Sequence, residues 1–122
     1  MANALVDTEW VAKYAHDPNV RLIEIDWDGL EEYKTGHIPG AIGWNWKTAL
    51  WDPTTRQFPT DDDFCARMAK AGIGNDTTVV FYGAPIQFGT YAWWVFKLFG
   101  HADVRMLDGG QVTWENEGRP IT

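Results

Sequence analysis

Apolar positions along the chain alternate between short continuous runs and segments in which they recur three or four residues apart. Runs of the first kind are typical of buried strands, and spacing of the second kind is typical of helices with one inward face. The predicted strands are Val20–Ile25, which ends at Asp26, Ala41–Trp44, Thr77–Tyr82 and Val104–Leu107. The alternation predicts a single α/β domain with a mostly parallel central sheet of about five strands and helices on both faces.

Each predicted helix begins at a residue that can cap it, or at a turn. The predicted starts are Asp7 or Thr8, Thr60 or Asp61, Gly89 or Thr90, and the turn Asp108-Gly109-Gly110. The second helix ends near Ala71 and directs Phe64 and Met68 toward the core. The third helix, Tyr91–Phe99, is apolar nearly all round and therefore requires cover on more than one face.

The junction between the strand Thr77–Tyr82 and the next helix is the most informative segment of the chain. In open α/β sheets, anions bind and nucleophiles lie at such junctions. The predicted loop consists of Gly83, Ala84, Pro85, Ile86, Gln87 and Phe88. Because it contains no cysteine, serine, lysine, arginine or histidine, the sequence predicts an active-site scaffold without an evident catalytic residue.

Two motifs that flank this junction resemble those of the rhodanese (sulfurtransferase) family. Residues 33–41 read Tyr-Lys-Thr-Gly-His-Ile-Pro-Gly-Ala, and residues 107–114 read Leu-Asp-Gly-Gly-Gln-Val-Thr-Trp, followed by Glu117-Gly118-Arg119-Pro120. The resemblance covers essentially the whole chain. Trp46, the Asp52-Pro53 segment and Phe99-Gly100-His101 also look like the N-terminal half of two-domain thiosulfate or 3-mercaptopyruvate sulfurtransferases.

The resemblance implies a chemistry for which this chain lacks the central residue. Active rhodanese domains carry a cysteine just after the central strand, and backbone N–H groups of a short loop stabilise its thiolate and persulfide. The matching position here is Gly83 or Ala84, and neither can accept sulfur. Pro85 removes one N–H group from the ring, and Ile86 and Phe88 occupy positions where polar or basic residues are expected.

By this resemblance, residues 1–122 form a rhodanese-like domain, the N-terminal half of a tandem sulfurtransferase, that is inactive alone and needs no cofactor. Its expected partner is a C-terminal catalytic rhodanese domain, in the same or a separate chain, or a second copy of itself. The catalytic domain would move sulfane sulfur from thiosulfate or 3-mercaptopyruvate through a cysteine persulfide. The residues expected at the cleft or interface are Asp26, His37, Trp46 and Trp94.

Two other functions stay open. The chain could be a stand-alone module that binds a small neutral or apolar ligand at the loop 83–88. It could also be an enzyme of altered chemistry that uses Asp26, His37 or Tyr82 as an acid or base.

Each candidate side chain also has a structural interpretation. Cys65, the single thiol, follows three aspartates and is expected to be a packed or half-buried residue without a role. His37 can bond nearby backbone and pin its turn, and Asp26 can order the loop after its strand. Asp108 can cap the following turn and helix. His16 and His101 follow helix ends, where a protonated ring complements the helix dipole.

The eight tryptophans leave a further choice open. They either belong to one aromatic core or form a hydrophobic docking face for a second domain or subunit. The tryptophans concerned are Trp44, Trp46, Trp51, Trp93 and Trp94.

Composition narrows the classes of partner. The formal charge of −7 and the isoelectric point near 4.7 argue against binding to a phosphate backbone. A single cysteine excludes an internal disulfide framework, and no histidine spacing supports a metal site. We expect a cytoplasmic protein without a membrane span, because no apolar run is long enough and the N-terminus lacks a signal-peptide pattern.

Overall fold

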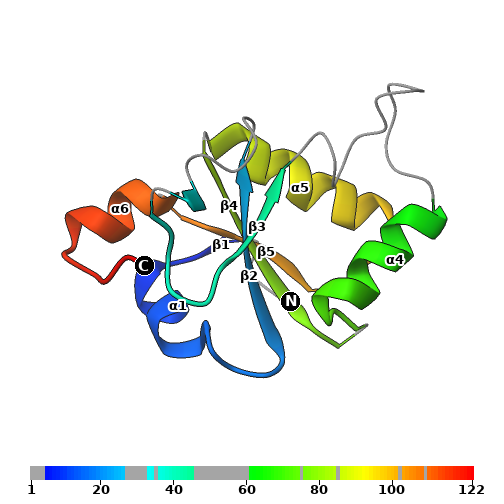
Figure 1. Cartoon of the computed structure of the whole chain (residues 1–122), viewed down its shortest axis with the longest axis horizontal. Coiled ribbons are helices and arrows are strands. Elements are labelled where there is room, and N and C mark those ends of the chain that lie inside the picture. The colour runs from blue at the N-terminus through cyan, green and yellow to red at the C-terminus, as the bar shows by residue number, and fades with distance from the viewer. Residues whose placement is uncertain are drawn as a thin grey trace.

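The computed structural model describes residues 5–26, 33–34, 36–45, 61–74, 76–84, 86–101, 103–108 and 110–122. Its elements follow one another as β1 (Leu5–Val6), α1 (Thr8–Tyr14), β2 (Val20–Asp26), β3 (Ile42–Asn45), α4 (Asp61–Ala71), β4 (Thr78–Ala84), α5 (Ile86–Leu98), β5 (Val104–Leu107) and α6 (Gly110–Asn116). The strands form one sheet in the order β1-β5-β4-β2-β3, and every neighbouring pair is parallel (Figure 1). The predicted α/β class is confirmed.

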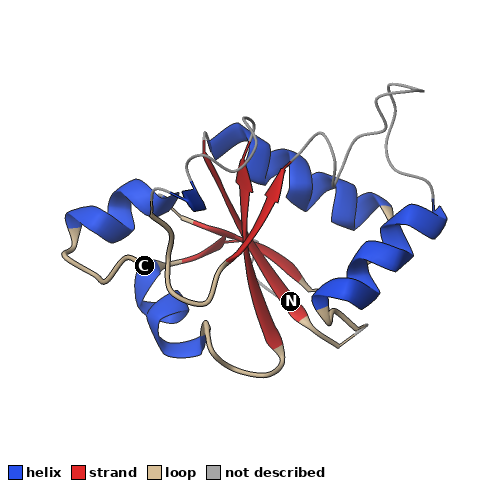
Figure 2. Cartoon of the chain, in the orientation of Figure 1, coloured by secondary structure: helices blue, strands red, loops and turns tan. Residues whose placement is uncertain are grey.

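Two apolar clusters cover the two faces of this sheet. Phe64 of α4 and Phe96 of α5 belong to the first cluster, whereas Val11 of α1 and Trp114 of α6 belong to the second. Figure 2 shows the same division, with α1 and α6 to the left of the strands and α4 to the right. Because side chains alternate along a strand, each central strand contributes to both clusters.

Phe96 is the centre of the first cluster. Its ring lies 4.8 Å from that of Phe81, 5.0 Å from that of Phe64 and 6.0 Å from that of Trp44, measured between centroids. Trp44 is therefore part of the aromatic core and not of a hydrophobic docking face. Trp46 and Trp51 lie outside the described residues.

Several local predictions are confirmed. Asp7 caps α1, since its side chain accepts a hydrogen bond from Trp10 N at 2.8 Å. The helix α4 has its predicted bounds, and Phe64 is buried on its inner face. The candidate cap Thr60 lies outside the described residues.

Other predictions were wrong. The helix α5 begins at Ile86 rather than at Gly89 or Thr90, so residues 86–88 are its first turn instead of a loop. A proline directly before a helix is tolerated, because the first helical N–H groups have no intrahelical partner. The strand β1 was not predicted; it is only two residues long and pairs with β5.

Two further side chains differ from expectation. Cys65 is exposed rather than packed or half-buried. His101 is 92% buried, since its relative exposure is 8%, and its Nε2 lies 2.8 Å from the carbonyl oxygen of Thr77. The ring of His101 thus holds the start of β4, a contact that its position after a helix end did not reveal. Within the described residues, no helix has the length and apolar character needed to cross a membrane.

Candidate active-site edge of the sheet

The junction between β4 and α5 lacks the residue types expected of a catalytic loop, and we call it the degenerate junction. It lies at the carboxyl ends of the central strands. Gly83 and Ala84 are the last two residues of β4, and in the parallel register Ala84 is the partner of Asp26 at the end of β2. Ile86, Gln87 and Phe88 open α5, and Pro85 lies outside the described residues. The chain therefore passes almost directly from strand to helix.

Two buried carboxyl groups lie next to this junction. Glu24 and Asp26 are both fully buried, and their spacing of two residues along β2 places them on the same face of the sheet. Asp26 Oδ2 accepts a hydrogen bond from Tyr33 N at 2.9 Å, whereas Asp26 Oδ1 has no hydrogen-bond partner in the part of the chain that the structure describes. Asp26 therefore holds the backbone that follows β2, the ordering role expected from the sequence. Since it has no contact with solvent, a role as an exposed general acid or base gains no support.

Tyr82 is the neighbour of Glu24 on β4 and is also fully buried. Its Oη accepts a hydrogen bond from Ile38 N at 3.2 Å. Burial raises the pKa of Tyr82 well above its ordinary value, and the negative charge of Glu24 raises it further. This direction favours the protonated phenol, so the geometry gives no support to Tyr82 as a general base.

His37 fixes the turn that faces these residues. Its Nδ1 lies 2.8 Å from the carbonyl oxygen of Tyr33, which can only accept, so Nδ1 carries the proton. Its ring stacks on that of Tyr33 with 3.8 Å between centroids and 6° between planes. Tyr33 Oη in turn donates to the carbonyl oxygen of Ala41 at 2.7 Å. This geometry is that of a structural histidine, in agreement with the interpretation that His37 bonds nearby backbone and pins its turn.

The same turn also holds the last residue of the chain. His37 N donates to the carbonyl oxygen of Thr122 at 3.1 Å, and Thr122 N donates to that of His37 at 2.9 Å. This bridge was not predicted, because nothing local in the sequence connects the two positions. Glu24 was not predicted as a site residue either, although a glutamate inside an otherwise apolar strand run is a visible signal.

Trp94 lies apart from the buried acids. It is on α5, which packs against the opposite face of the sheet from the one that Glu24 and Asp26 share with Leu22. Trp94 is 47% exposed and Leu98, one turn later, is 55% exposed. Side chains four residues apart lie on one side of a helix, so the two form an exposed apolar stripe. The structure thus brings Asp26, Tyr82 and His37 together, through hydrogen bonds to Tyr33 and Ile38. Trp94 does not belong to this group, and Trp46 lies outside the described residues.

The comparisons with known proteins agree with the fold and with these motifs. A family model for the rhodanese-like domain matches residues 7–117. The chain belongs to the rhodanese family. The sulfur carrier protein TtuD of Thermus thermophilus is 48% identical over 119 residues, which cover 97% of this chain and 41% of that protein.

Solved structures give the same result. This rhodanese-like domain matches YnjE with a TM-score of 0.86 and 30% identity, over 98% of this chain and 30% of that one. It matches the Escherichia coli 3-mercaptopyruvate sulfotransferase SseA with a TM-score of 0.83 and 28% identity, over 99% of this chain and 50% of that one. The chain spans less than half the length of the curated relatives it matches, between 38% and 44%. The related proteins therefore contain a further part.

Proposed function

We propose that residues 1–122 serve as a non-catalytic rhodanese-like domain of a thiosulfate or 3-mercaptopyruvate sulfurtransferase. A separate catalytic rhodanese domain, C-terminal to it in the same chain or in another chain, carries the persulfide cysteine. The observation that carries the proposal is the junction from β4 to α5, where Gly83 and Ala84 end the strand and no residue up to Tyr91 has a thiol. The greater length of the relatives supports a second domain.

The position of the single thiol supports the same proposal. Cys65 lies on α4 and lines a cavity together with Gly74 and His101. These two residues precede β4 and β5, so Cys65 lies toward the amino edge of the sheet, whereas the degenerate junction is at the carboxyl edge. A sulfur atom on Cys65 would therefore not meet the backbone N–H groups at the start of α5.

The role of the domain under this proposal is to stabilise the catalytic partner and to wall the cleft between them. His37 and the junction Gly83–Ala84 belong to the proposed wall on the carboxyl side, where Asp26 acts from beneath through its bond to Tyr33 N. The stripe formed by Trp94 and Leu98 is the proposed contact surface. Exposed apolar side chains of this size favour burial against a partner. The proposal includes a cytoplasmic location, where a lone thiol stays reduced.

The test measures association and sulfur transfer in the same samples. The 122-residue chain is assayed with thiosulfate and cyanide, alone and with the C-terminal part of the Thermus thermophilus relative, and the mass of each mixture is determined by light scattering. We expect no thiocyanate above background from the chain alone, with or without Cys65→Ser, and a one-to-one active complex in the mixture.

Matched variants show whether the stripe makes the contact. Trp94→Ser and Leu98→Ser should each weaken the complex by about tenfold or more, since each removes a large apolar contact. Val112→Ser is the control, because Val112 is 68% exposed but lies on α6, on the other face of the sheet. The proposal is wrong if the isolated chain turns over thiosulfate in a way that depends on Cys65. It is also wrong if the chain is a monomer that does not bind the second domain.

A further inference from the structure

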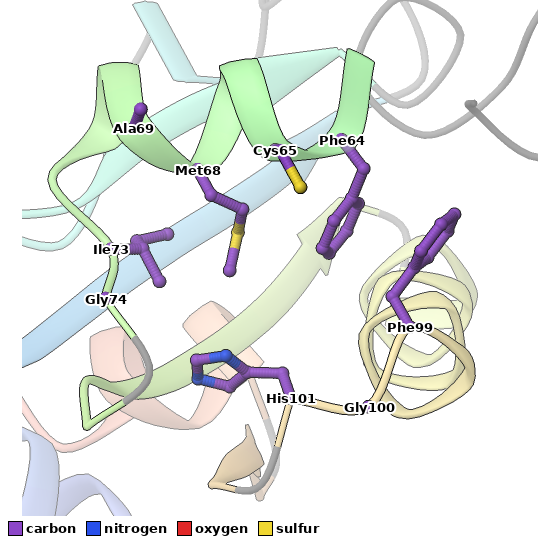
Figure 3. A pocket seen from close by; sticks show the side chains of 9 residues that line it. All are labelled: Phe64, Cys65, Met68, Ala69, Ile73, Gly74, Phe99, Gly100 and His101. Atoms are coloured by element: carbon purple, nitrogen blue, oxygen red, sulfur yellow. The ribbon is translucent and has the colours of Figure 1, made fainter. Parts of the chain in front are cut away.

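A cavity of about 590 Å³ opens between α4, the end of α5 and the segments that lead into β4 and β5. Six side chains make most of its wall: Phe64, Cys65, Met68, Ile73, Phe99 and His101. Figure 3 shows the sulfur atoms of Cys65 and Met68 directed into it, with the imidazole of His101 below them. This volume lies within the range of small-molecule sites in proteins.

The wall of the cavity is mainly aromatic and apolar. Phe64 and Phe99 stack with 4.2 Å between ring centroids and 8° between planes. Figure 3 shows Met68 between Ile73 and Phe64, so that a polarizable thioether faces the same space as the rings. Thioether sulfur and stacked phenyl groups are favourable neighbours for another aromatic ring.

His101 supplies one polar group in this apolar wall. Its side chain is nine-tenths buried, and its Nε2 lies 2.8 Å from the carbonyl oxygen of Thr77. Because a carbonyl oxygen can only accept, Nε2 carries the proton, and the neutral ring presents Nδ1 as an acceptor. Among the described residues, Nδ1 has no hydrogen-bond partner. An acceptor that faces an apolar cavity and has no protein partner among the described residues favours a ligand that can donate.

We propose that this cavity binds a small uncharged aromatic molecule that carries one N–H or O–H donor, of the indole or phenol type. Its ring packs against Phe64, Phe99 and Met68, and its donor bonds Nδ1 of His101. An uncharged ligand fits better than an anion, since the chain carries a net charge of −7. This site lies at the edge of the sheet opposite the degenerate junction and does not depend on the proposed role in sulfur transfer.

Cys65 provides a reporter at the mouth of the cavity. The chain of residues 1–122 is treated with iodoacetamide at increasing concentrations of indole, and alkylation is followed by mass spectrometry on the peptide that contains Cys65. A ligand in the cavity covers the thiol, so indole at about ten times its Kd should slow alkylation about tenfold. The control ligand 1-methylindole has the same ring but no donor, and it should bind about fivefold more weakly or worse.

Two alanines on α4 make a matched pair of variants. Ala69 and Ala66 are both exposed, but only Ala69 lines the cavity. Ala69→Trp should abolish the protection of Cys65 by indole, because the new side chain fills the space, whereas Ala66→Trp should leave it unchanged. The proposal is overturned if indole gives no saturable protection up to its solubility limit. It is also overturned if 1-methylindole protects equally well, or if the two variants behave alike.

Discussion

Tyr82 on β4 and Glu24 on β2 are direct partners in the sheet, and both are completely buried. A carboxyl group in a protein interior is costly unless it is hydrogen-bonded. The negative charge of Glu24 acts on the Tyr82 hydroxyl and raises its pKa. The same hydroxyl accepts a hydrogen bond from Ile38 N, in the turn that precedes β3. The pair therefore connects the centre of the sheet to the segment that His37 and Tyr33 organise.

Removal of this hydroxyl should destabilise the fold. Tyr82→Phe keeps the ring but takes the hydrogen-bond acceptor from the buried backbone N–H of Ile38, so we expect the free energy of unfolding to fall by about 1–3 kcal/mol. Urea titration measures the change. Tyr14→Phe, at a half-buried tyrosine of α1, is the control and should change stability by less than about 0.5 kcal/mol. Equal effects of the two substitutions would contradict this account.

The close approach of β3 to Tyr33 gives a second prediction. A Cβ atom at Gly43 would lie 2.7 Å from Tyr33 Cγ, and the ring cannot easily retreat because His37 stacks on it and its hydroxyl bonds Ala41. Gly43→Ala should therefore lower stability by about 1–3 kcal/mol, seen as a drop of several degrees in Tm.

Gly74 offers the comparison for that experiment. Among the described residues, a Cβ atom there would have one near neighbour, Thr77 Oγ1 at 4.0 Å, which is an ordinary contact. Gly74→Ala should thus leave Tm nearly unchanged. If the Gly43→Ala protein has the same Tm as the Gly74→Ala protein, the ring of Tyr33 is free to move.

The elements that sequence analysis located have a strong local signal. The strands β2, β4 and β5 are apolar runs of the right length, and the cap Asp7 and the inner face of α4 follow from spacing alone. The start of α5 was misplaced, because glycine and proline near Gly83 are equally typical of a loop. The two residues of β1 are too few to show any period.

The relationships that define the candidate site are long-range, and sequence analysis could not reach them. Nothing near His37 indicates that its backbone pairs with Thr122, and nothing near His101 indicates that its ring is buried against Thr77. The burial of Glu24 follows from its place in a sheet covered on both faces. The sequence shows which residues could act as an acid, a base or a nucleophile. Tertiary packing determines which of these residues are exposed.

The stacked ring of His37 gives a third prediction. His37→Ala removes the stack on Tyr33 and the hydrogen bond from Nδ1, so stability should fall by about 1–2 kcal/mol. The turn should also loosen at its bridge to the chain end, so hydrogen exchange at Thr122 N should become faster. His16→Ala, at an exposed histidine, should change neither quantity appreciably. Unchanged exchange at Thr122 in the His37 variant would contradict the coupling.

A carboxylate at the amino edge of the sheet gives a prediction on pH. Asp103 accepts hydrogen bonds from Thr78 Oγ1 at 2.7 Å and from Arg105 Nε at 2.9 Å, and it thereby connects the starts of β4 and β5. Burial raises the pKa of Asp103, but the hydrogen bonds from Arg105 and Thr78 outweigh it and hold the pKa below its ordinary 3.8.

The sign of the effect on stability follows from that direction. A carboxyl group whose pKa is lower in the folded state stabilises the fold above its unfolded pKa of 3.8, and this contribution is lost as the pH falls through the folded pKa. Asp103→Asn should therefore cost about 1 kcal/mol near neutral pH, and its difference from the wild-type protein should shrink below pH 3.8. NMR titration of the Asp103 carboxyl carbon should give a midpoint below 3.8 that rises in Arg105→Gln, because the variant loses the charge-assisted hydrogen bond. A midpoint at or above 3.8 in the wild-type protein would mean that burial outweighs the two donors.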